Sequence, residues 1–173
     1  MTSSGPNEYP QIVEEDPKDT LLAFEKTVQP AAASPVRYRT DTSESRLNIS
    51  VVFTSAESTV AALKKAGSLA DNLGARITLV VPQLVPYPRP LDEPPVQTEW
   101  NESRFEEIVS QSSVETTVTI YLCRDRLRTL NAVLRTGSIV VVGCRNSRWP
   151  TSEVRLARKL RERGHEVILT EAE

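Results

Sequence analysis

The chain has 173 residues, enough for one domain and a tail, with a formal net charge of −2 and 39% apolar residues. So small a net charge does not indicate a polyanion as the partner of the whole chain, and no apolar run reaches the ~18 residues that cross a membrane. The polar, acidic start lacks the basic and apolar regions of a signal peptide. Two cysteines without a CxxC pair favour neither a disulfide framework nor a zinc site. We therefore expect a cytoplasmic protein without a metal.

The first 46 residues differ in composition from the rest. They contain five prolines and carry eight Asp or Glu against five Lys or Arg. Such a segment buries too little apolar area to offset the entropy of ordering it. We therefore expect a disordered tail over 1–46 and one domain over 47–173. Within the tail, Asp19–Val28 predicts a short helix with Asp19 as its N-cap, either nascent or used as a docking motif.

From residue 47 on, strand and helix patterns alternate. Apolar runs typical of strands occur at 48–54, 76–81, 115–123, 138–143 and 165–170. Helical spacing of apolar residues occurs at 57–73, 98–112, 125–136 and 151–163, and a loop with six prolines spans 82–95. This order predicts an α/β fold with a mostly parallel sheet and helices on both faces. Ligands of such sheets lie at the carboxyl ends of the strands, where the strand order reverses.

The segment Asn48–Val81 resembles the start of universal stress proteins, because a strand leads to a helix ending in Leu73-Gly74-Ala75 and then to a second strand. The resemblance extends over roughly residues 47–172 and includes the Pro-rich loop, Ile139–Gly143 and the last helix–Gly–strand unit. It implies a Rossmann-like domain of the adenine nucleotide alpha hydrolase type, with an open five-stranded parallel sheet in the order 3-2-1-4-5. It also implies a homodimer through the last strand, 165–170, whose apolar edge would pair with its symmetry mate.

The sequence departs from the ATP-binding members of that family at both nucleotide-binding elements. Those members have an acidic residue after the first strand, where this chain has Phe53-Thr54-Ser55. Their phosphate loop has Gly, two residues, Gly, nine residues, then Gly and Ser or Thr. Gly143 matches the first position, and Asn146, Leu156 and Ala157 occupy the others. Without those glycines, backbone N–H groups cannot approach a phosphate closely. We therefore expect ATP or AMP binding to be lost or weak, and no cofactor.

A remnant of this loop could still bind an anion at the expected start of a helix. Its residues are Gly143, Arg145, Asn146, Arg148, Thr151 and Ser152. The first hypothesis is a universal stress protein-like regulatory or interaction domain with an unidentified protein partner. We expect no enzyme activity, because no nucleophile–base pair can be identified. The alternative is a small-anion or nucleotide-binding module that uses the Arg145–Ser152 loop.

Positive charge is concentrated near the end of the chain. Residues 124–163 contain eleven Lys or Arg and three Asp or Glu. The predicted last helix, 152–163, places Arg155, Lys159 and Arg163 on one face. A nucleic-acid surface on this helix is the third hypothesis. We favour a solvated helix face instead, since residues 47–173 together carry a charge of only +1.

Four single residues allow both a functional role and a packing role. Trp149 could stack on a base, but tryptophan is usually buried, which favours packing at the end of the sheet. His165 lacks a catalytic partner and is expected to be a partly exposed strand residue. Cys123 and Cys144 belong to strands that are not neighbours in the family's order. We therefore expect two small apolar residues and no disulfide, with a reactive thiol at Cys144 as the alternative.

Overall fold

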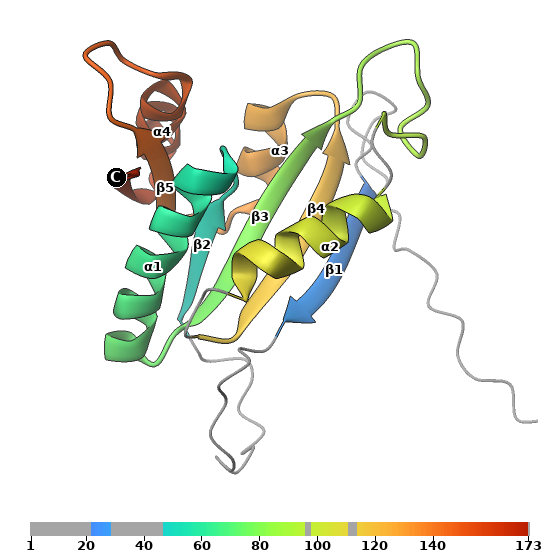
Figure 1. The fold of residues 1–173 in the computed structure, drawn as a ribbon. Helices are drawn as coiled ribbons and strands as arrows, with labels where there is room; N and C mark the ends of the chain where they lie inside the picture. The colour runs from blue at the N-terminus through green and yellow to red at the C-terminus, as the bar shows by residue number, and fades with distance from the viewer. Residues whose placement is uncertain (1–21, 29–46, 96–97, 111–113, 173) are drawn as a thin grey trace, which may run out of the picture.

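Figure 1 shows the computed structural model of the chain, which describes residues 22–28, 47–95, 98–110 and 114–172. Six strands form one sheet in the order β1-β4-β3-β2-β5-β6. Five of them are parallel: β2 (Asn48–Val52), β3 (Arg76–Leu84), β4 (Thr116–Cys123), β5 (Ile139–Arg145) and β6 (Glu166–Ala172). Their order, counted along the predicted domain, is the expected 3-2-1-4-5, so the Rossmann-like α/β prediction is confirmed.

Helices cover both faces of the sheet, as predicted. α1 (Ala56–Leu73) and α2 (Thr98–Val109) lie in front of the sheet in Figure 1, and α3 (Arg126–Val133) and α4 (Ser152–Glu162) lie behind it. Among the described residues, no helix combines the length and the apolar character needed to cross a membrane.

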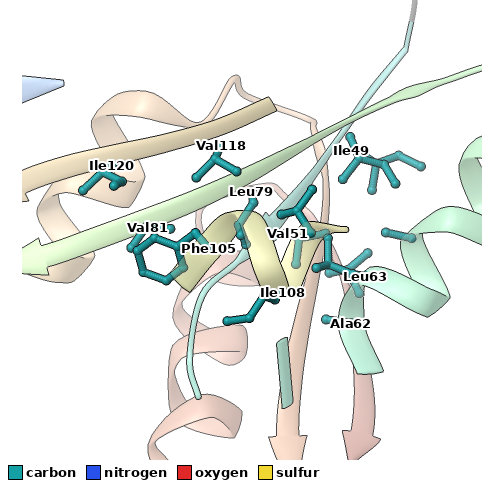
Figure 2. Packing of buried hydrophobic residues seen from close by; sticks show 14 of the residues in the cluster. Ile49, Val51, Ala62, Leu63, Leu79, Val81, Phe105, Ile108, Val118 and Ile120 are labelled. Atoms are coloured by element: carbon teal, nitrogen blue, oxygen red, sulfur yellow. The ribbon is translucent and has the colours of Figure 1, made fainter. Parts of the chain in front are cut away.

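The two layers of helices pack on alternate residues of the strands. Val51 belongs to the cluster under α1 and α2, whereas Val52 belongs to the cluster under α3 and α4, because successive strand residues point to opposite faces. Figure 2 shows the first cluster, to which Leu63 of α1 and Phe105 of α2 both belong. Both faces of the central strands are therefore buried, which explains their continuous apolar runs.

The ends of α1 follow from the chemistry of two residues. The Ser55 hydroxyl accepts a hydrogen bond from the backbone N–H of Ser58 at 3.3 Å and so caps the first turn. Gly74 has a φ of 62°, and its N–H bonds to the carbonyl of Ala70, as glycine does at the end of a helix. This closure of α1 directs the chain into β3.

The N-terminal part of the chain differs from the prediction. β1 (Leu22–Val28) is a strand and not the second half of a helix, and it pairs antiparallel with β4 from Leu22 opposite Leu122 to Val28 opposite Thr116. A short apolar run is compatible with either element. The edge of β4 supplies a ladder of hydrogen bonds, whereas a helix this short would be marginal in water. The rest of the expected tail, 1–21 and 29–46, lies outside the described residues.

Candidate functional site

The strand order reverses between β2 and β5, which are neighbours in the centre of the sheet. In open α/β sheets, ligands lie at the carboxyl edge of this reversal point. Here the two segments that leave the sheet at that edge are Phe53–Ser55, after β2, and the loop that joins β5 to α4. The predicted loop residues follow the second of these strands.

Gly143 lies on β5 directly beneath the first turn of α1. A Cβ atom on Gly143 would sit 1.8 Å from the carbonyl oxygen of Ser58. The carbonyl oxygen of Gly143 accepts a hydrogen bond from Thr54 Oγ1 at 3.0 Å. Glycine is therefore required here because a helix approaches a strand closely. This packing explains the glycine, and no phosphate ligand is needed to explain it.

The other predicted site residues follow Gly143 in the chain but do not surround it. Arg145, Asn146 and Arg148 are exposed. Thr151 caps α4, because its Oγ1 accepts a hydrogen bond from the N–H of Val154 at 3.4 Å, and Ser152 begins the helix and is exposed. The structure thus separates a buried glycine from an exposed loop and a capped helix start.

Two residues that the sequence pattern did not single out complete this edge. Arg126, the first residue of α3, donates a hydrogen bond from Nη2 to the carbonyl oxygen of Phe53 at the end of β2. Its Nε is buried and has no hydrogen-bond partner among the described residues. Burial lowers the pKa of Arg126, whereas the negative charge of Glu153 acts to raise it. The opposite charges of Arg126, at the start of α3, and Glu153, at the start of α4, thus attract each other across this edge.

Glu153 lies in the first turn of α4. Burial alone would raise the pKa of this carboxyl group, but hydrogen bonds from Thr151, its own backbone N–H and Ser152, together with the charge of Arg126, lower it below the ordinary value. Helix N-termini attract anions, and here a carboxylate of the chain itself takes that position. An acidic residue in the first turn was the sequence signal. The second sequence signal was Arg126, because a cation at the start of a helix is unfavourable unless an anion lies nearby.

The segment after β2 is likewise engaged in packing. The ring of Phe53 meets that of Phe105 edge to face, with centroids 4.9 Å apart. The N–H of Thr54 donates to Thr59 Oγ1 at 3.3 Å, and Ser55 caps α1. The position at which the family resemblance would place an acidic residue therefore holds groups that fix α1 to the sheet.

Trp149 is not a packing residue, so that prediction is wrong. Its side chain is 79% exposed, and its backbone N–H donates to Ser147 Oγ at 3.3 Å within the same loop. Residues 145–150 are all exposed. The loop projects beyond the sheet, so that the indole has no apolar surface to cover.

His165 is buried, 7% exposed, and not partly exposed as expected. Its Nδ1 lies 3.2 Å from Ser138 Oγ, which satisfies the ring inside the fold. Cys123 and Cys144 are free and buried, as predicted. Burial raises the pKa of both thiols, and the charges of Glu171 and Glu153 raise that of Cys144 further. A thiolate is therefore disfavoured at Cys144, which argues against the reactive alternative.

Among the described residues, neither a metal-ligand group nor a charge-selective groove is found elsewhere. Within those ranges, no three His, Cys, Asp or Glu side chains are grouped to hold a metal ion. An open groove of about 790 Å³ lies beside α1, α2 and the end of β6. Its lining mixes Lys64 and Lys65 with Glu57 and Glu171, so it does not select a ligand of either charge.

Comparison with protein-family models, with curated proteins and with solved structures finds no match for this chain.

Proposed function

We propose that the chain is a cytoplasmic, non-catalytic regulatory or interaction domain similar to universal stress proteins, without ATP binding of the family type. The observation that carries the proposal is that groups of the chain itself occupy two of the places where the resemblance implies phosphate contacts. The first turn of α1 covers Gly143, and Glu153, held by Thr151 and Ser152, occupies the start of α4. A domain that retains the strand order implied by the resemblance but fills its ligand positions is suited to contacts with other proteins.

Calorimetric titration of the full chain with ATP-Mg²⁺, and separately with AMP, tests this proposal. We expect no binding in the micromolar range, and a micromolar dissociation constant would overturn it. A matched pair of variants tests the reason. Glu153→Ala should gain affinity for inorganic phosphate, because it frees the helix start, whereas Glu153→Ala combined with Arg126→Ala should lose that gain.

The alternative, an anion site on the Arg145–Ser152 loop, predicts a different result. The wild type would bind phosphate or AMP, and Arg145→Ala with Arg148→Ala would abolish that binding. Such an outcome would replace the first proposal with the second, since both arginines are exposed and outside the packing around Gly143.

We further propose that two copies pair through β6 as a homodimer. β6 is at one end of the sheet and pairs only with β5 among the described strands. The N–H of Glu166 donates to Ser138 in the direction of β5, so Val167, Leu169 and Glu171 direct their backbone groups away from the sheet. Arg161 donates to the outward carbonyl of Val167 at 2.7 Å. A partner strand would therefore pair mainly with Leu169 and Glu171.

Sedimentation at tens of micromolar tests the dimer, with an expected mass of twice the monomer's 19.2 kDa. Leu169→Pro removes an outward N–H but leaves the ladder to β5 intact, so it should give a monomer. Leu169→Ala is the matched control, because it loses the same side-chain packing and keeps the N–H. A monomeric wild type, or dissociation by both variants alike, would refute pairing through this edge.

A further inference from the structure

The exposed tryptophan beside two arginines is a feature that packing within the domain does not explain. Trp149 exposes 79% of its surface, and Arg145 and Arg148 in the same loop are exposed as well. Leaving so large an apolar ring in water gives up the free energy of burying it. Residues 145–152 contain no Asp or Glu, so the loop presents an aromatic ring in a purely cationic setting.

The loop continues into a helix whose outer face is also cationic. Arg155, Lys159 and Arg163 are all exposed, and four-residue steps place them about 6 Å apart along the axis of α4. None of the three forms an ion pair with another described residue, whereas Arg158 lies 4.0 Å from Glu162. The three charges are therefore available to an external anion.

The carboxylates of this region do not cancel its positive charge. Residues 145–163 contain seven Lys or Arg and two Asp or Glu, a balance of +5. Of the two acidic side chains, Glu153 is bound by groups at the α4 start and interacts with Arg126, and Glu162 pairs with Arg158. In Figure 1 the loop between β5 and α4 projects at the upper left, beyond the edge of the sheet. Residues 145–150 of the loop and Arg155, Lys159 and Arg163 are thus close in the chain and exposed.

We propose that this surface, formed by Arg145, Arg148, Trp149, Arg155, Lys159 and Arg163 and here called the loop–α4 surface, binds single-stranded nucleic acid. Cations spaced along a surface track a phosphate backbone, and an exposed aromatic ring stacks on a base. Trp149 would stack on one base while the cations of α4 hold the phosphates that follow. A paired duplex offers no free base face, and a protein partner would not call for a row of cations with so little compensating charge. This activity goes beyond the function proposed above and does not depend on it.

Fluorescence anisotropy of a short labelled oligouridylate, titrated with the full chain over a salt series, tests the proposal. Trp149→Ala should weaken binding roughly tenfold. The triple change Arg155→Ala, Lys159→Ala and Arg163→Ala should reduce the slope of log affinity against log salt by about 2. All four side chains are exposed, so these variants should keep the far-UV circular dichroism of the wild type.

The matched control removes the same charge elsewhere, by Lys65→Ala, Arg76→Ala and Arg135→Ala, which are exposed residues outside the loop–α4 surface. It should change affinity and salt slope little. The proposal is overturned if the wild type does not bind at low salt, if Trp149→Ala binds as well as the wild type, or if the control triple weakens binding equally. Binding of polyglutamate without binding of the oligonucleotide would also overturn it, and would indicate an acidic protein partner instead.

Discussion

Replacing Gly143 by alanine is the sharpest perturbation of the contact between α1 and β5. The new Cβ would lie 1.8 Å from the Ser58 carbonyl oxygen and 2.4 Å from its carbonyl carbon. Since such contacts are not shorter than 3.0 Å, the helix start must move by at least 1.2 Å (3.0 − 1.8). Overpacking of flexible side chains costs about 1–3 kcal/mol, and here the backbone itself must move. Losing the hydrogen bond from Thr54 adds about 1 kcal/mol.

We therefore expect Gly143→Ala to lower the free energy of unfolding by roughly 3–4 kcal/mol and the melting temperature by about 10 °C or more. Urea unfolding followed by circular dichroism measures the first quantity, and thermal unfolding followed in the same way measures the second. Gly74→Ala is the control, because its Cβ meets nothing within 4 Å and only the φ of 62° is strained, at about 1 kcal/mol. If Gly143→Ala lowers the free energy of unfolding no more than Gly74→Ala does, the close contact between Gly143 and the backbone of Ser58 is refuted. A glycine retained for phosphate would instead leave stability nearly unchanged.

Three further predictions concern the carboxylate at the α4 start, the N-terminal strand and the buried thiol. Glu153→Gln should cost roughly 1 kcal/mol near neutral pH. Because the folded-state pKa of Glu153 is lowered, its contribution is present above the unfolded-state pKa and lost as pH falls through the folded-state value, so urea unfolding in acid should no longer distinguish variant from wild type. A chain that lacks residues 1–46 should still unfold cooperatively. It should aggregate more than a chain that lacks only 1–21, because the loss of β1 uncovers the edge of β4. Equal sedimentation of the two shortened chains would contradict this. Cys144 should react with an aromatic disulfide only slowly in the native state, at a rate that follows unfolding, and rapid reaction would place it at the surface.

The parallel core was predictable because each of its strands carries its own signal. Val51 and Val52 face opposite layers and are both fully buried, which requires the apolar run that the sequence shows. β1 was mispredicted because its conformation depends on β4, far along the chain. Local spacing near Asp19 favoured a helix and contained no information on that partner.

The candidate edge was only partly predictable for a similar reason. The sequence placed a helix start near Thr151 and Ser152, and Thr151 caps α4. The role of the loop residues as a site stays a prediction. The interaction of Arg126 with Glu153 requires that α3 and α4 begin at the same edge and on the same face of the sheet, which only the assembled topology supplies. The burial typical of tryptophan does not apply to Trp149, because its loop neighbours are polar or charged and the loop is exposed.

The pairing of β1 with β4 also sets an order of events during synthesis. Leu22 pairs with Leu122, so β1 leaves the ribosome before its partner strand, which is made 100 residues later (122 − 22). At about 5–20 residues per second, this delay is on the order of 5–20 s. During that time an apolar segment with unpaired backbone groups is open to other nascent chains. The adjacent charges of Glu25 and Lys26 interrupt it, as gatekeeper residues do in strands that must stay soluble before they pair.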